Sequence, residues 1–187
     1  MPAMKPDSIP SLDECRALIY RYSMRPNIIE HSMRVMDVSL AITDNLVPGT
    51  RIDRDLVAAA SLLHDITKTR SLETKERHDV SGARLLRELG YLRVADIVEQ
   101  HVFFRDFSPG GALEEREIVY YADKRVMHNA IVTVEERVAD LVARYGTTPE
   151  RTALIIKNKD FILALEKKIC SFMAVDMEYA IDLLLKR

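Results

Sequence analysis

The stretch that decides the fold is DRDLVAAASLLHDITK, residues 53–68. Its second half is almost wholly apolar, so it predicts a central buried helix that begins at Asp53 and ends near Ile66. His64 and Asp65 stand at the end of this helix. Burying such a pair without partners is costly, whereas a metal ion accepts an imidazole nitrogen and a carboxylate oxygen together.

Two more metal-capable residues lie within apolar helices. His31 stands in the middle of a predicted helix among aliphatic side chains, and Asp123 stands in VYYADK, again on a helix with an apolar face. Helix bundles build metal sites from side chains on facing helices. We therefore expect His31, His64, Asp65 and Asp123 to meet at one ion.

The composition is that of an ordinary globular protein. The chain has 187 residues, 48% of them hydrophobic and 30% charged, and its formal net charge is −2. Bulk positive charge is missing, so we expect neither a nucleic-acid partner nor a membrane surface. Two cysteines, Cys15 and Cys170, are too few for a disulfide framework. With no apolar leader at the N-terminus, these features favour a cytoplasmic protein.

The whole chain can be interpreted as helices, because glycine and proline are scarce and no alternating strand pattern is found. We predict an all-α, single-domain bundle of about seven to nine helices, with loops at 67–77 and 106–111. The expected helices cover about 12–22, 26–46, 53–66, 78–89, 92–103, 113–129, 133–145, 148–170 and 174–186. We expect an N-terminal arm and first helix (1–26), a metal-binding core (27–146) and a C-terminal helical extension packed on the core (147–187).

The order of these residues resembles the HD-domain superfamily of metal-dependent phosphohydrolases. The family pattern is H…HD…D, which His31, His64-Asp65 and Asp123 match in order. HDITK resembles the HDIGK of the family, and YYADK resembles its [LY]-x-A-D motif. The resemblance covers about residues 27–145. It implies an HD-type helical fold and a hydrolase of phosphate esters.

Two further histidines resemble the HDIG-type branch of that family. His78 and Gly82 match its H-x3-G segment, and His101 ends the next predicted helix. In binuclear members, histidines at these places hold a second ion that shares the Asp of HD. The resemblance therefore implies one ion at His31, His64, Asp65 and Asp123, and a second at Asp65, His78 and His101. The departures are Thr67 for the Gly of HDIG, Val102 for a second His, and Asn27 for a carboxylate.

The resemblance also suggests roles in phosphoester hydrolysis. A divalent ion lowers the pKa of bound water from about 15.7 toward roughly 7. Asp65 and Lys68 are the candidate catalytic residues: Asp65 would orient the attacking water, and Lys68 would reach a phosphate oxygen as a point charge. The candidate substrate-binding residues are Lys68, Arg77, Lys124 and Arg105. One or two ions of Mn, Fe, Co, Ni or Zn suit these ligands.

The resemblance implies phosphate mono- or diesters as substrates, in particular nucleotides or dinucleotides. A dinucleoside-polyphosphate hydrolase is a close variant of this expectation. Two other classes stay open: a non-catalytic regulatory module that binds metal or nucleotide, and di-iron oxygenase-like chemistry. The loop from Phe103 to Gly111 carries three aromatics and Arg105, which either stack on a nucleotide or anchor the loop. The C-terminal helices are candidates for a lid or a homodimer face.

Overall fold

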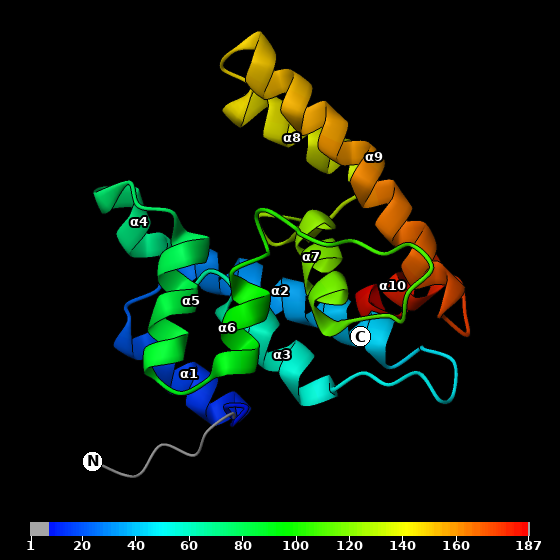
Figure 1. Cartoon of the computed structure of the whole chain (residues 1–187), viewed down its shortest axis with the longest axis horizontal. Helices are drawn as coiled ribbons and strands as arrows, with labels where there is room; N and C mark the ends of the chain where they lie inside the picture. The colour runs from blue at the N-terminus through cyan, green and yellow to red at the C-terminus, as the bar shows by residue number, and fades with distance from the viewer. Residues whose placement is uncertain (1–7, 187) are drawn as a thin grey trace.

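The computed structural model describes residues 8–186, and residues 1–7 of the predicted N-terminal arm lie outside the described part. Helices dominate it, so the all-α prediction is confirmed (Figure 1). The helices are α1 Leu12–Arg21, α2 Pro26–Thr43, α3 Arg54–Leu63, α4 Lys68–Thr74, α5 His78–Glu88, α6 Leu92–Val98, α7 Glu115–Lys124, α8 Val134–Tyr145, α9 Pro149–Ser171 and α10 Met177–Leu185. A two-stranded hairpin joins β1 Val126–Met127 to β2 Ala130–Ile131.

The start of several helices follows from local chemistry. Ser11 caps α1 in a capping box with Glu14, which confirms the predicted start of this helix. Pro26 occupies the first turn of α2, where its missing N–H costs nothing. The predicted capping box at Thr133 is also confirmed, with Glu136 bonding back to it at the start of α8.

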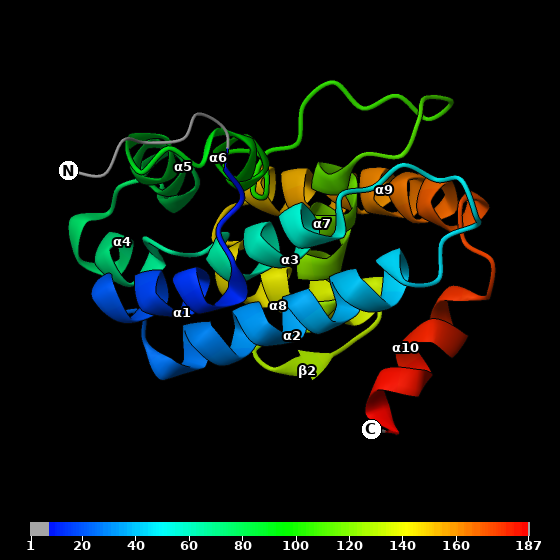
Figure 2. The same cartoon turned by 90° about the horizontal axis from the view of Figure 1, so that it is seen from below.

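The centre of the molecule is the pair α2 and α3 (Figure 2). Every residue of α3 from Leu56 to Leu63 is buried, which confirms the prediction of a central buried helix. Helix α7 packs on both α2 and α3, while α6 packs on α3 and on α5. The helices that supply the candidate metal ligands therefore surround one core.

Three element boundaries were wrong. The stretch predicted as a loop at 67–77 contains α4, a short helix with no buried residue. The helix expected over 113–129 ends at Lys124, and the chain then turns into the hairpin β1–β2. The helix expected over 92–103 ends at Val98, so that His101 lies in the bend after it.

The C-terminal helices have two kinds of surroundings. The second half of α9 is buried against α7, where Lys168 Nζ donates to Glu117 Oε1 over 2.7 Å between two buried side chains. Helix α10 packs on α2. The first half of α9 instead pairs with α8 and extends away from the other helices (Figure 1). Within residues 8–186, every helix is too short or too polar to cross a bilayer.

Candidate metal centre

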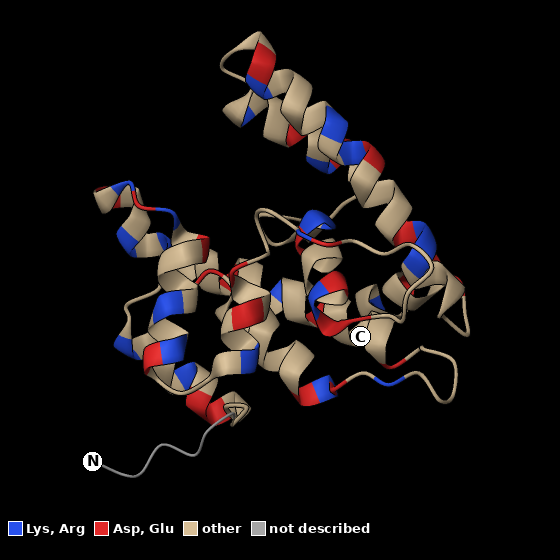
Figure 3. Cartoon of the chain, viewed as in Figure 1, with Lys and Arg blue, Asp and Glu red and all other residues tan. Residues whose placement is uncertain are grey.

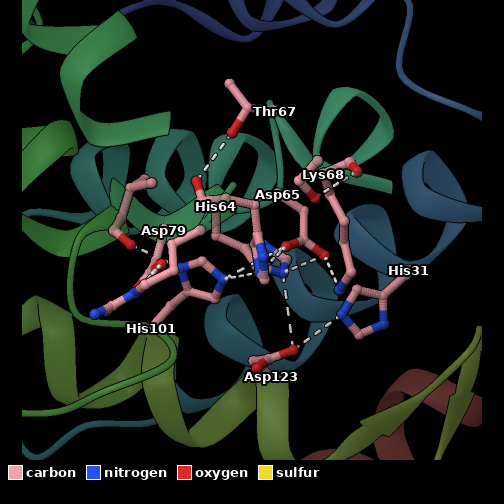
Figure 4. A network of polar contacts seen from close by, with 12 residues as sticks. His31, His64, Asp65, Thr67, Lys68, Asp79, His101 and Asp123 are labelled. Carbon is pink, nitrogen blue, oxygen red and sulfur yellow. Dashed lines mark hydrogen bonds and ion pairs between the residues drawn. The ribbon is translucent and has the colours of Figure 1, made fainter. Parts of the chain in front are cut away.

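The six predicted ligands come from five places in the chain and meet in the interior (Figure 4). His31 lies on α2, and Asp123 lies near the end of α7. The others occupy helix ends: His64 and Asp65 follow α3, His78 begins α5, and His101 follows α6.

The turn after α3 seats α5 beside the HD pair. Thr67 Oγ1 donates to the carbonyl of His78 over 2.9 Å and lies 2.9 Å from Ser81 Oγ. Gly82 faces the same turn, and a Cβ there would lie 3.3–3.4 Å from side-chain atoms of Val98, Ile66 and Thr67. The H-x3-G spacing thus reflects close approach of α5, and Thr67 replaces the expected Gly with a hydrogen bond to α5.

The first group contains His31, His64 and Asp65, with Asp123 beside them. His31 Nε2 lies 2.9 Å from Asp123 Oδ1. His64 Nε2 lies 3.4 Å from Asp65 Oδ2 and 3.8 Å from Asp123 Oδ1. All four residues are buried.

The second group contains Asp65, His78 and His101. Asp65 Oδ1 lies 3.3 Å from His78 Nε2 and 3.4 Å from His101 Nε2. The two Nε2 atoms are 3.1 Å apart. Asp65 therefore offers one oxygen to each group, as a carboxylate that bridges two ions would.

Backbone carbonyls orient three of these rings. Nδ1 of His31, His64 and His101 lies 2.7–2.9 Å from the carbonyl oxygens of His128, Ser61 and Val98, respectively. A carbonyl only accepts, so each Nδ1 carries a proton and donates it. In each neutral ring the lone pair then lies on Nε2 and points into the cluster, as in protein sites where such a bond fixes a metal-binding imidazole.

Several of these atoms need a cation between them. His64 Nε2 and Asp65 Oδ1 are buried and have no hydrogen-bond partner among residues 8–186. The Nε2 atoms of His78 and His101 face each other within hydrogen-bond distance. Within the described part of the chain, no contact fixes the tautomer of His78, so its Nε2 either donates a proton to His101 Nε2 or, with the proton on Nδ1, offers a second lone pair to a metal ion. The residues present therefore fit one or two divalent ions.

The electrostatics keep both carboxylates ionised. In the metal-free protein, burial opposes the charge of Asp65, but Lys68 and the protonated form of His64 outweigh it and hold the pKa of Asp65 well below its usual range. Burial likewise opposes the charge of Asp123, but Lys124 and, where its ring carries both protons, His31 hold the pKa of Asp123 well below the usual range in the metal-free protein. Burial lowers the pKa of His101, which favours the neutral ring that a metal requires.

The candidate substrate-binding cations occupy different positions. Lys68 Nζ donates to Asp65 Oδ2 over 2.7 Å, and its side chain is 35% exposed. Lys124 is buried, and its Nζ donates to Asp123 Oδ2 and to the carbonyl of His101. Arg105 Nη2 lies 3.5 Å from Glu99 on the surface. Of these three, the structure brings Lys68 and Lys124 to the metal-binding candidates.

Sequence reasoning missed two features around the centre. Both oxygens of the buried Asp79 carboxylate accept hydrogen bonds from Arg77, which is the fourth candidate substrate-binding residue. His128, expected to be a surface residue, has an exposed side chain but supplies its carbonyl to His31. The Arg77-His78-Asp79 tripeptide is a sequence signal for the first feature, whereas nothing in the sequence marks the carbonyl.

Comparison with known proteins places this geometry in a family. The HD domain family matches residues 28–127, which is more than half of the chain and includes all the candidate metal ligands. An uncharacterized protein of Methanocaldococcus jannaschii is 29% identical, over 72% of this chain and 87% of its own length.

Other relatives match over smaller shares of their length. A tRNA (cytidine(56)-2′-O)-methyltransferase of Thermoplasma volcanium is 37% identical over 50% of this chain and 26% of the relative. The protein of the same name from Picrophilus torridus is 30% identical over 68% of this chain and 40% of its own length. The chain thus spans less than half of these two relatives. The crystal structure of a predicted HD superfamily hydrolase from an uncultured Thermotogales bacterium is 21% identical, covers 87% of this chain and 92% of that chain, and has a TM-score of 0.49.

The family match includes the His31, His64-Asp65 and Asp123 pattern, and these side chains converge in the fold. The chain belongs to the HD-domain family.

Proposed function

We propose that the protein is a metal-dependent hydrolase of phosphate mono- or diesters, with nucleotides or dinucleotides as its substrates. The observation that carries the proposal is Asp65, a buried carboxylate that offers one oxygen to each of two histidine groups. Divalent ions held in this way supply a hydroxide at neutral pH and neutralise charge on phosphate oxygens.

The residues of this chain would divide the work. Asp65, with the rings of His31, His64, His78 and His101 and with Asp123, would hold the ions. Lys68 is the candidate for binding a phosphate oxygen, because its ammonium already lies beside Asp65 and is partly exposed. Burial opposes its charge, but Asp65 and Asp123 raise the pKa of Lys68, so it stays charged at neutral pH. Lys124 would hold Asp123 in place from inside the protein.

The proposal is tested with purified protein by metal analysis and by a panel of phosphate monoesters, diesters and nucleotides. We expect Asp65→Ala to lose bound metal and turnover together, since both groups contain Asp65. The loss should exceed the roughly 10–100-fold effect of changing a residue behind a metal ligand. The matched control is Asp96→Ala, which removes a carboxylate that is 67% exposed on α6.

The outcomes separate the three classes of function. Turnover that persists in Asp65→Ala, with the fold verified by circular dichroism, would overturn the hydrolase proposal. Wild-type protein that binds metal but hydrolyses nothing in the panel would support a regulatory module instead. Bound iron together with oxygen-dependent turnover would support oxygenase-like chemistry.

A further inference from the structure

The candidate metal centre is accessible from one side, where α4 and α5 begin. The side chains of Lys68 and of the candidate ligand His78 are 35% and 24% exposed, whereas those of the other five candidate metal ligands are at most 10% exposed. A substrate that brings a phosphate to Asp65 must therefore approach past these two residues. The rest of that substrate will contact whatever side chains flank them.

Two exposed side chains flank this entrance. Arg77 directly precedes His78, and Phe103 follows His101 by two residues. Consecutive Cα atoms are about 3.8 Å apart, so Arg77 lies directly beside one ligand of the second group, and Phe103 lies within two residues of another. The guanidinium carbon of Arg77 lies 4.8 Å from the centre of the Phe103 ring, within the range of a cation–π contact. Asp79 fixes that guanidinium through bonds of 2.5 and 3.2 Å.

Phe103 differs from the other phenylalanines of its loop. Phe104 and Phe107 each pack against Phe161 with ring centres 5.2–5.4 Å apart, so they anchor the loop to α9. Phe103 is 61% exposed. Phe104 and Phe107 thus anchor the loop, whereas the Phe103 ring is exposed and contacts the guanidinium that Asp79 fixes.

We propose that Phe103, backed by Arg77, is a stacking platform for the purine or pyrimidine base of a nucleotide. The inference rests on the proposed function, because the phosphate of that nucleotide would lie at Asp65. Flat bases stack on exposed aromatic rings, and an arginine at the ring adds cation–π attraction. Arg77 thereby takes a different role from the phosphate contact expected from the sequence, since Asp79 already neutralises its charge.

The first test uses the absence of tryptophan from the chain. Phe103→Trp places a single fluorescent indole on the platform, and metal-free protein is titrated with adenosine 5′-monophosphate and with ribose 5-phosphate. We expect quenching by the nucleotide and none by the sugar phosphate, which lacks a base. The matched control is Tyr20→Trp, an 87% exposed aromatic position on α1, which should respond to neither.

The second test is kinetic and uses protein loaded with manganese. Base stacking is worth about 1–3 kcal/mol by alanine substitution, so Phe103→Ala should raise KM for adenosine 5′-monophosphate by about 5–150-fold. KM for ribose 5-phosphate should not change, and Phe103→Trp should restore nucleotide binding. An equal rise for both compounds, or unquenched Phe103→Trp fluorescence, would overturn the platform.

The two proposals fail in different ways. If the wild type hydrolyses ribose 5-phosphate but Phe103→Ala leaves nucleotide turnover unchanged, the hydrolase stands and the platform is wrong. If nucleotide quenches Phe103→Trp but no phosphate ester is ever hydrolysed, the platform stands and the proposed function is wrong.

Discussion

At the scale of single residues, the buried carboxylate of Asp123 links protonation to folding. Its pKa in the folded, metal-free protein is held well below the value of about 3.9 for an unfolded aspartate. Below about pH 4 the unfolded chain therefore takes up a proton that the folded chain lacks, and the stabilisation from the ionised carboxylate is lost as the pH falls.

We predict that Asp123→Asn flattens the acid limb of the stability curve. Removing one such carboxylate should reduce the slope of unfolding free energy against pH by up to about 1.4 kcal/mol per pH unit below pH 4. Urea unfolding of metal-free protein between about pH 2.5 and 6 measures this slope. The exposed variant Asp96→Asn is the control, and parallel curves for Asp123→Asn and wild type would contradict the prediction.

The convergence of the metal-ligand candidates could be predicted from the sequence. The backbone carbonyls that orient their rings could not. His31, His64 and Asp123 are polar groups in apolar helices, and each needs a partner that the sequence can name by chemical type. The structure brings them together around Asp65. The carbonyl of His128 is different, because every residue has a carbonyl and only the geometry of a turn selects one.

At the scale of elements, the turn of the hairpin β1–β2 places the backbone carbonyl of His128 beside the His31 ring. His128 has φ +57°, a left-handed conformation that glycine adopts freely and that a β-branched residue resists. Asn129, next in the turn, accepts a bond from Arg34 on α2, and the His128 ring contacts Arg144 on α8. The turn is thus held from two helices.

We predict that His128→Val and His128→Gly have different effects, although both remove the imidazole. Valine should cost about 1–2 kcal/mol in strain and displace the carbonyl from His31, which weakens metal binding. Glycine keeps the conformation and should bind metal as the wild type does. Metal titration and the ¹⁵N shifts of the His31 ring in metal-free protein measure the difference. Equal affinity in the two variants would show that the turn does not position His31.

The wrong boundaries have a common physical origin. Helix α4 lies in a polar stretch with no buried residue, so hydrophobic periodicity gave no signal for it. Each strand of the hairpin has two residues, which is too short to show alternation. In contrast, α1 and α8 could be predicted from capping boxes, because those are contacts between residues three apart in the chain.

At the scale of the whole molecule, α8 and the first half of α9 extend from the body (Figure 1). Figure 3 shows Lys or Arg positions and Asp or Glu positions interspersed along this pair of helices. The outer half of α9 also exposes two aliphatic residues. Leu154 and Ile156 are 67% and 53% exposed, whereas Leu165 on the same helix is fully buried. The outer half contributes little to the core, which helps to explain why the sequence left its role open.

We predict that the same leucine-to-alanine substitution at two positions of α9 changes the free energy of unfolding by very different amounts. Leu165→Ala should lower the free energy of unfolding by about 2–5 kcal/mol, because it empties a filled core position. Leu154→Ala should change it by less than about 0.5 kcal/mol, because that side chain already faces solvent. Urea unfolding at two protein concentrations measures both costs. If Leu154→Ala destabilises by more than about 1 kcal/mol, and the loss grows with protein concentration, the outer half of α9 is buried against a second copy of the chain.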